Sequence, residues 1–176
     1  MKSTARVAGH PIHPMLIPFP FALLSTATVF DVIDQARHRQ ASGIERADHA
    51  FGRTAGHLQD AGLLSAVVAA VPGIVDCFGS VPRGTPAARH ATWHAVFNSS
   101  ALVAFVLARG ERDADGAISE RGLGLSLLGS LLLGAGGWLG GELVYHHHIG
   151  VDDASPTAEL EPGQDRHRVP ARTANM

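Results

Sequence analysis

The chain contains four long apolar stretches separated by polar segments. They cover residues 15–36, 57–81, 90–109 and 122–145, and each is close to the about 20 mainly apolar residues that a helix needs to cross a bilayer. None of them shows the polar stripe that a helix of a soluble bundle presents to water. The pattern therefore predicts an all-α fold, an integral membrane four-helix bundle.

Polar segments lie on both sides of this transmembrane domain, which spans residues 15–148. Residues 1–14 form an N-terminal segment rich in His and Pro, and residues 149–176 form a polar, Pro-containing tail that we expect to be disordered. The first apolar stretch could be a signal peptide, but it is longer than the usual apolar run of one. It is also followed by Asp31 and Asp34 and not by a small-residue cleavage site. We expect it to remain as a span.

The fourth stretch contains glycines at a spacing typical of helix packing. Gly136 and Gly140 are four residues apart, as are Gly137 and Gly141. Small residues at this spacing let helix backbones approach closely in lipid. The pattern predicts close packing within the chain, which we favour, or a homo-oligomer contact.

Charge narrows the range of partners and predicts an orientation. The net charge of −2 and the absence of a basic stripe argue against nucleic acid as a partner. The loops after the first and third stretches contain more Lys and Arg than the opposite side. Because positive loops stay in the cytoplasm, we expect both termini outside.

Histidine and carboxylate side chains collect at the predicted outer ends of the spans. Eleven of the 176 residues are His. His10 and His13, in the motif GHPIHP, precede the first span, and His94 follows the start of the third by about one turn. Asp76 and Glu142 lie near the outer ends of the second and fourth spans. Ionisable groups inside a membrane usually mark a site, because their burial is costly.

These residues can be read as a cofactor site in two ways. For a b-type haem, His13 and His94 would be the axial ligands, His10 would lie close behind, and Arg83 would neutralise a propionate or Asp76. For a nonhaem transition metal, the ligands would come from His13, His94, Glu142 and Asp76. Both readings predict a small membrane protein with a redox role.

Two readings without a cofactor stay open. The histidines could be satisfied by hydrogen bonds, with Asp76 paired to Arg83, Arg89 or His90, in a structural subunit that docks a partner. A proton or small-solute transporter would depend on Asp76 or Glu142. The sequence contains no nucleophile elbow and no phosphate-binding loop, so it favours a protein that is not an enzyme by itself. The inner end offers fewer candidates, namely Asp31 and Asp34 on one helix face and His57 with Asp60.

Three segments together resemble a known family. GHPIHPMLIPFPFALL, PGIVDCFGSVPRGTPAARHATWHAVFN and GGWLGGELVYHHHIGVDD are similar to the bacterial membrane proteins called domain of unknown function 2231. The resemblance covers Gly9 to about Asp153 and implies four helices in the bacterial inner membrane. Some members are joined to Rieske-type iron–sulfur domains, which implies a Rieske-type or other membrane or periplasmic redox partner. The family-typical polar positions are His10, His13, Asp31, Asp76, Arg83, His94, Asn98 and Glu142.

One of these positions departs from the pattern of some relatives. Where they carry His, this chain has Glu142. The resemblance therefore implies a harder metal or a proton-carrying role if that position contributes to the site.

Overall fold

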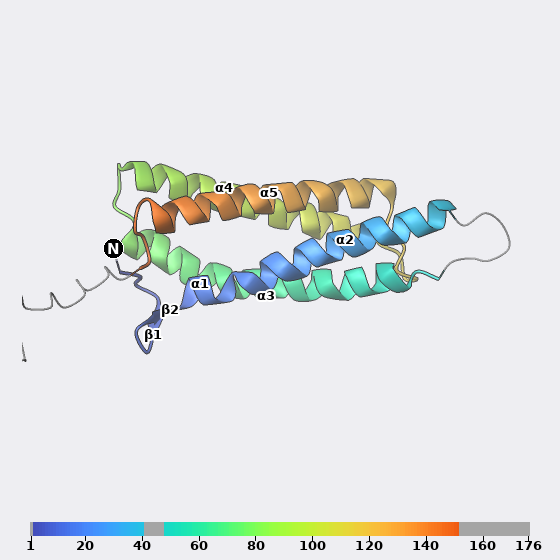
Figure 1. The fold of residues 1–176 in the computed structure, drawn as a ribbon, viewed down its shortest axis with the longest axis horizontal. Coiled ribbons are helices and arrows are strands. Elements are labelled where there is room, and N and C mark those ends of the chain that lie inside the picture. The colour runs from blue at the N-terminus through green and yellow to red at the C-terminus, as the bar shows by residue number, and fades with distance from the viewer. Residues whose placement is uncertain (1, 41–47, 152–176) are drawn as a thin grey trace, which may run out of the picture.

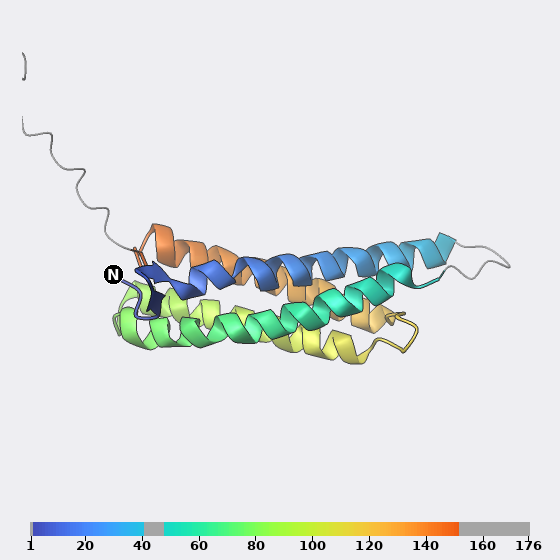
Figure 2. The ribbon, with the colours of Figure 1, turned by 90° about the horizontal axis from the view of Figure 1, so that it is seen from below.

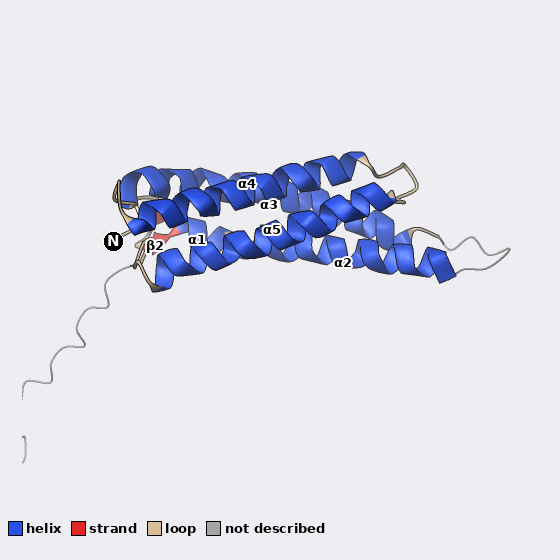
Figure 3. Ribbon diagram, turned by 90° about the horizontal axis from the view of Figure 1, so that it is seen from above, coloured by secondary structure: helices blue, strands red, loops and turns tan. Residues whose placement is uncertain are grey.

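Four long helices run side by side along the molecule (Figure 1). The structure is a computed structural model that describes residues 2–40 and 48–151. The long helices are α2 (Pro18–Gln40), α3 (Ala50–Ser80), α4 (Pro86–Gly110) and α5 (Glu120–Tyr145). A short helix, α1 (Ile12–Leu16), precedes α2. Strands β1 (Arg6–Val7) and β2 (His10–Pro11) pair as a small antiparallel hairpin at the same end of the bundle (Figure 3).

The predicted all-α membrane bundle is confirmed. Four helical segments are long and apolar enough to cross a membrane, and they are Ile12–Gln40, Ala50–Ser80, Pro86–Gly110 and Glu120–Tyr145. The helices extend beyond the apolar stretches of the sequence: α3 begins at Ala50 and not at residue 57, and α2 continues to Gln40. Hydropathy marks the part of a helix that contacts hydrocarbon, whereas helix formation continues into polar residues. The tail from residue 152 onward, predicted to be disordered, lies outside the described residues.

Side-chain caps define where two of the helices begin. The Thr85 hydroxyl accepts a hydrogen bond from the Ala88 N–H, at 3.3 Å, and Pro86 follows at the first position of α4. Ser119 caps α5 in the same way through the Gly122 N–H, at 3.0 Å. Such caps satisfy backbone donors that have no partner within the helix.

Small residues bring the helices together. α2 lies along α3, and α4 lies along α5 (Figures 1 and 2). A Cβ atom at Gly62 would lie 2.7 Å from Leu24, and one at Gly129 would lie 2.9 Å from Phe105. Both contacts are shorter than real Cβ contacts, so only glycine permits these helix separations. The central cluster is Leu24, Ala101, Phe105 and Leu133.

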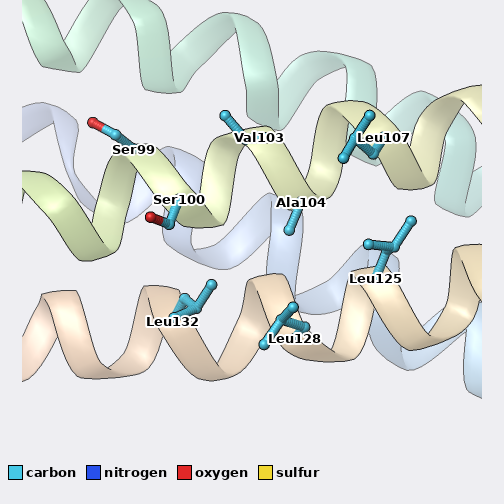
Figure 4. A pocket seen from close by; sticks show the side chains of 8 residues that line it. All are labelled: Ser99, Ser100, Val103, Ala104, Leu107, Leu125, Leu128 and Leu132. Atoms are coloured by element: carbon cyan, nitrogen blue, oxygen red, sulfur yellow. The ribbon is translucent and has the colours of Figure 1, made fainter.

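Large apolar side chains point away from the bundle. Phe78, Leu131 and Trp138 are each more than 70% exposed, at 78%, 74% and 74%. A soluble protein rarely carries so much apolar surface, whereas a lipid environment accommodates it. A shallow groove between α4 and α5 belongs to this surface (Figure 4). Its lining is apolar apart from two serines and consists of Ser99, Ser100, Val103, Ala104, Leu107, Leu125, Leu128 and Leu132.

Candidate functional site at the His94 end

The polar residues predicted to gather at the outer membrane face lie at one end of the bundle. We call this the His94 end; it contains α1, the end of α3, the beginning of α4 and the end of α5 (Figure 1). The opposite end, where α2 and α4 end and α3 and α5 begin, is called the Asp34 end. Each end has its own group of His and carboxylate side chains.

His13 packs against the backbone of α3. Its Nδ1 atom lies 2.8 Å from the carbonyl oxygen of Ala69. A Cβ atom at Gly73 would lie 2.7 Å from Cε1 of His13, so glycine leaves the space that the ring occupies. A carbonyl oxygen can only accept a hydrogen bond, so Nδ1 carries the proton. The Nε2 atom of a neutral ring then has a lone pair available to a metal.

His94 is held against α5 in the same manner. Its Nδ1 atom lies 2.8 Å from the carbonyl oxygen of Gly136. A Cβ atom at Gly140 would lie 3.1 Å from Cε1 of His94. The amide of Asn98 donates to the His94 carbonyl oxygen at 2.7 Å. Neutral His94 therefore has the same tautomer as His13, and its Nε2 atom lies 3.5 Å from the Asn98 amide nitrogen.

The two imidazoles lie next to one another in an edge-to-face arrangement. Their ring centroids are 6.4 Å apart and their planes are at 88°. His13 contacts α3 at Ala69 and Gly73, and His94 contacts α5 at Gly136. These positions lie well before the ends of α3 and α5, at similar depth. The predicted pair of His13 and His94 is thus adjacent in space.

Asp76 is occupied by the N-terminal segment. Its carboxylate accepts hydrogen bonds from the hydroxyl of Ser3, at 2.8 and 2.9 Å, and from the N–H groups of Thr4 and Ala5, at 2.7 and 2.9 Å. Asp76 is only 8% exposed. These partners replace the arginine or His90 that the sequence suggested for Asp76. The carboxylate anchors the chain just before the β1–β2 hairpin.

The other candidates at this end are spread over separate contacts. Glu142 accepts a hydrogen bond from Nδ1 of His146. His90 Nδ1 lies 2.9 Å from His147 Nε2, so part of the triple-histidine segment contacts α4. His10 on β2 and Arg83 in the turn between α3 and α4 are exposed.

The three-ligand metal set predicted here is not brought together. Among residues 2–40 and 48–151, one group of at least three His, Cys, Asp or Glu residues has all its ligand atoms within 4.8 Å of one another. That group is Asp34, His38 and His49, at the Asp34 end. Sequence reasoning missed it, because His49 lies outside every apolar stretch. The only local signal was the i, i+4 spacing of Asp34 and His38.

Fold and surface define the class of the chain, which is a multi-pass integral membrane protein built from four packed helices. The chain belongs to the family described as "Predicted membrane protein (DUF2231)", whose model matches residues 9–153. The resemblance seen in the sequence motifs is therefore confirmed. No match was found among the curated proteins or among the solved structures.

Proposed function

We propose that this protein holds a b-type haem between His13 and His94 and passes electrons to or from a membrane or periplasmic partner. The observation that carries the proposal is the pairing of the two rings, with centroids 6.4 Å apart and each Nδ1 bonded to a carbonyl. If a haem is bound, His13 and His94 would hold its iron through their Nε2 atoms.

The number of available donors favours haem over a nonhaem metal. Two imidazoles lie next to one another at this position, while Asp76 and Glu142 have other partners. A nonhaem ion usually takes three or four ligands from the protein. The iron of a haem takes four from the porphyrin and needs only two axial groups. The donor set therefore suits haem, which would supply one-electron chemistry.

The chain's own groups orient the two rings. Hydrogen bonds from Nδ1 to the carbonyl oxygens of Ala69 and Gly136 fix the ring orientation and make each Nε2 a stronger donor. Gly73 and Gly140 leave the space that the rings occupy. Arg83, exposed beside the same end, would neutralise a propionate. His10 stays a second candidate near the site.

The location and partner follow from the charge bias and the family resemblance. Arginine-rich loops at the Asp34 end favour that end in the cytoplasm and the His94 end outside, in a bacterial inner membrane. A Rieske-type protein is one partner class of suitable chemistry. Electron exchange would then occur at the outer face, because it is the membrane face nearer to His13 and His94.

One observation favours the alternative function, a structural subunit that docks a partner and binds no cofactor. Asp76 is used entirely to anchor Ser3, Thr4 and Ala5, so at least one of the buried ionisable groups has a structural role. If the histidines behave likewise, their substitution would change assembly and leave no spectroscopic trace.

The visible spectrum decides between the haem protein and the docking subunit. The protein is purified in detergent from cells supplied with haem, and spectra are recorded oxidised and dithionite-reduced, with haem content per chain. We expect about one haem per chain and a Soret band that sharpens and shifts on reduction. His13→Ala and His94→Ala should lose the haem. His90→Ala is the matched control, because His90 shares a face of α4 with His94 and bonds to His147.

Two results would overturn the proposal. Folded wild-type protein without a chromophore would support the docking subunit. Full haem content with unchanged spectra in His94→Ala would show that the haem, if present, is held elsewhere.

A further inference from the structure

We propose that the Asp34 end carries a separate binding site for a divalent transition metal of the zinc class, formed by Asp34, His38 and His49. Asp34 and His38 lie on successive turns near the end of α2, and His49 immediately precedes α3. Their ligand atoms all lie within 4.8 Å of one another. The site is independent of the haem proposal, because it lies at the opposite end of the bundle.

The distances within the group match a metal site closely. His49 Nδ1 lies 2.7 Å from Asp34 Oδ2, and His38 Nδ1 lies 3.7 Å from the same oxygen. Around a tetrahedral zinc ion with bonds of about 2 Å, neighbouring ligand atoms are about 3.3 Å apart. The two observed distances bracket this value. To bring three donors onto one ion, His38 would turn away from the Asp34 carbonyl oxygen and the two stacked rings would tilt toward one another.

The two rings are already arranged side by side. Their centroids are 3.7 Å apart and their planes differ by 1°. His38 Nδ1 also donates a hydrogen bond to the Asp34 carbonyl oxygen, at 2.9 Å, so coordination through this atom would take the place of that hydrogen bond. The side chains of His38 and His49 are both 26% exposed, whereas that of Asp34 is 3% exposed. An ion can therefore reach the imidazoles from solvent while the carboxylate stays fixed beneath them.

The two carboxylate oxygens of Asp34 have different roles in this proposal: Oδ1 caps a helix and Oδ2 binds the metal. Oδ1 accepts a hydrogen bond from the Gly52 N–H, at 3.1 Å, in the first turn of α3. His49, the residue before α3, provides no side-chain cap, so Asp34 caps this helix from α2. Oδ2 accepts a hydrogen bond from His49 Nδ1 at 2.7 Å, and a metal ion would take the place of that hydrogen bond. Binding would connect the end of α2 to the start of α3.

The arginines at this end have partners of their own. Arg37 lies over the ring of Phe51, at 5.3 Å, and Arg53 lies 3.6 Å from Asp48. Arg112 binds Asp31 at 2.7 Å. Among the residues that the structure describes, the carboxylate of Asp34 is thus paired with imidazole and not with guanidinium. Two imidazoles and one carboxylate suit Zn²⁺, Co²⁺, Ni²⁺ or Cu²⁺, with water completing the coordination.

A cobalt titration tests the site directly. Protein carrying an affinity tag without histidine is freed of metal, titrated with Co²⁺ and then with Zn²⁺, and followed by visible absorption and metal analysis. We expect a saturable Co²⁺ band that Zn²⁺ displaces. His38→Gln and His49→Gln should each weaken binding at least tenfold, since even the outer partners of metal ligands contribute about 10- to 100-fold.

His57→Gln is the matched control, because His57 is an exposed histidine in α3 at the same end. It should bind Co²⁺ as the wild type does. His94→Ala should also leave this titration unchanged, so the two proposals can fail separately. Helix content by circular dichroism checks that each variant is folded.

Either of two outcomes overturns the site. The first is no Co²⁺ binding by folded wild-type protein. The second is binding that His38→Gln and His49→Gln leave unchanged, which would place the ion on other histidines such as His146 and His147.

Discussion

The buried ion pair between Asp31 and Arg112 gives a prediction whose size follows from burial. Arg112 Nη2 donates to both carboxylate oxygens of Asp31, at 2.7 and 2.9 Å, and the two side chains are 3% and 1% exposed. Arg112 Nη1 donates to the carbonyl oxygens of Gly52 and Gly116. One guanidinium group therefore connects α2, α3 and the loop between α4 and α5.

Asp31→Ala should destabilise the protein strongly. The substitution leaves the Arg112 guanidinium buried without its counter-charge, and breaking a buried pair in this way costs about 3–5 kcal/mol. The pair of Arg109 and Asp60 offers a matched comparison at the same end. Its N–O distance is also 2.7 Å, but its side chains are 41% and 50% exposed. Asp60→Ala should cost about 1 kcal/mol or less, because exposed pairs are screened by water.

The free energy of unfolding is measured by titrating SDS into detergent-purified protein and following helix content by circular dichroism. Asp31→Asn is added because it removes the charge but keeps a hydrogen-bond acceptor. Its free energy of unfolding should lie between those of the wild type and Asp31→Ala. Equal losses for Asp31→Ala and Asp60→Ala would refute the reasoning, since the two pairs differ in burial and not in distance.

Two further substitutions, each with a control substitution, test the packing and the N-terminal anchor. Gly129→Ala would place a Cβ atom 2.9 Å from a core aromatic ring and should cost about 1–3 kcal/mol in the same SDS titration. Gly134→Ala, where a Cβ atom meets nothing within 4 Å, should be neutral or stabilising. Asp76→Ala removes the acceptor that holds the N-terminal segment, so trypsin should cleave after Arg6 several-fold faster. Cys77→Ser changes the exposed neighbouring residue, and this variant should be cleaved by trypsin at the wild-type rate. An equal increase in the cleavage rate of Cys77→Ser would contradict the anchoring role of Asp76.

The number and type of the helices could be predicted from the sequence, but their ends could not. A bilayer requires a long uninterrupted apolar run, and this chain contains four of them. The start of α3 at Ala50 depends partly on a cap that Asp34 provides from α2, in addition to the local Asp48 carboxylate, which accepts a hydrogen bond from the Ala50 N–H. A cap from a distant residue leaves no local signal in the sequence.

The sequence predicted how deep along the helices the candidate residues lie, but not which neighbours their side chains contact. Placing His13 and His94 near one membrane face required only their distance from the ends of the apolar stretches. Assigning Asp76 a partner required knowing that Ser3 folds back onto α3, and the polar N-terminal segment gives no periodicity from which to infer this. His49 was missed because it lies outside every apolar stretch and meets His38 only through the tertiary fold.

The glycines of α5 show why spacing alone cannot separate packing from site formation. Gly136 and Gly140 have the four-residue spacing of a helix-contact motif, and both face α4 within the chain. Yet the backbone carbonyl of Gly136 also accepts the hydrogen bond from His94, and the missing side chain of Gly140 leaves room for its ring. Gly134, on the same helix, meets nothing within 4 Å and has neither role. The same small residues that let two helices approach in lipid therefore also allow an imidazole to lie between them, with its Nδ1 fixed by a backbone carbonyl.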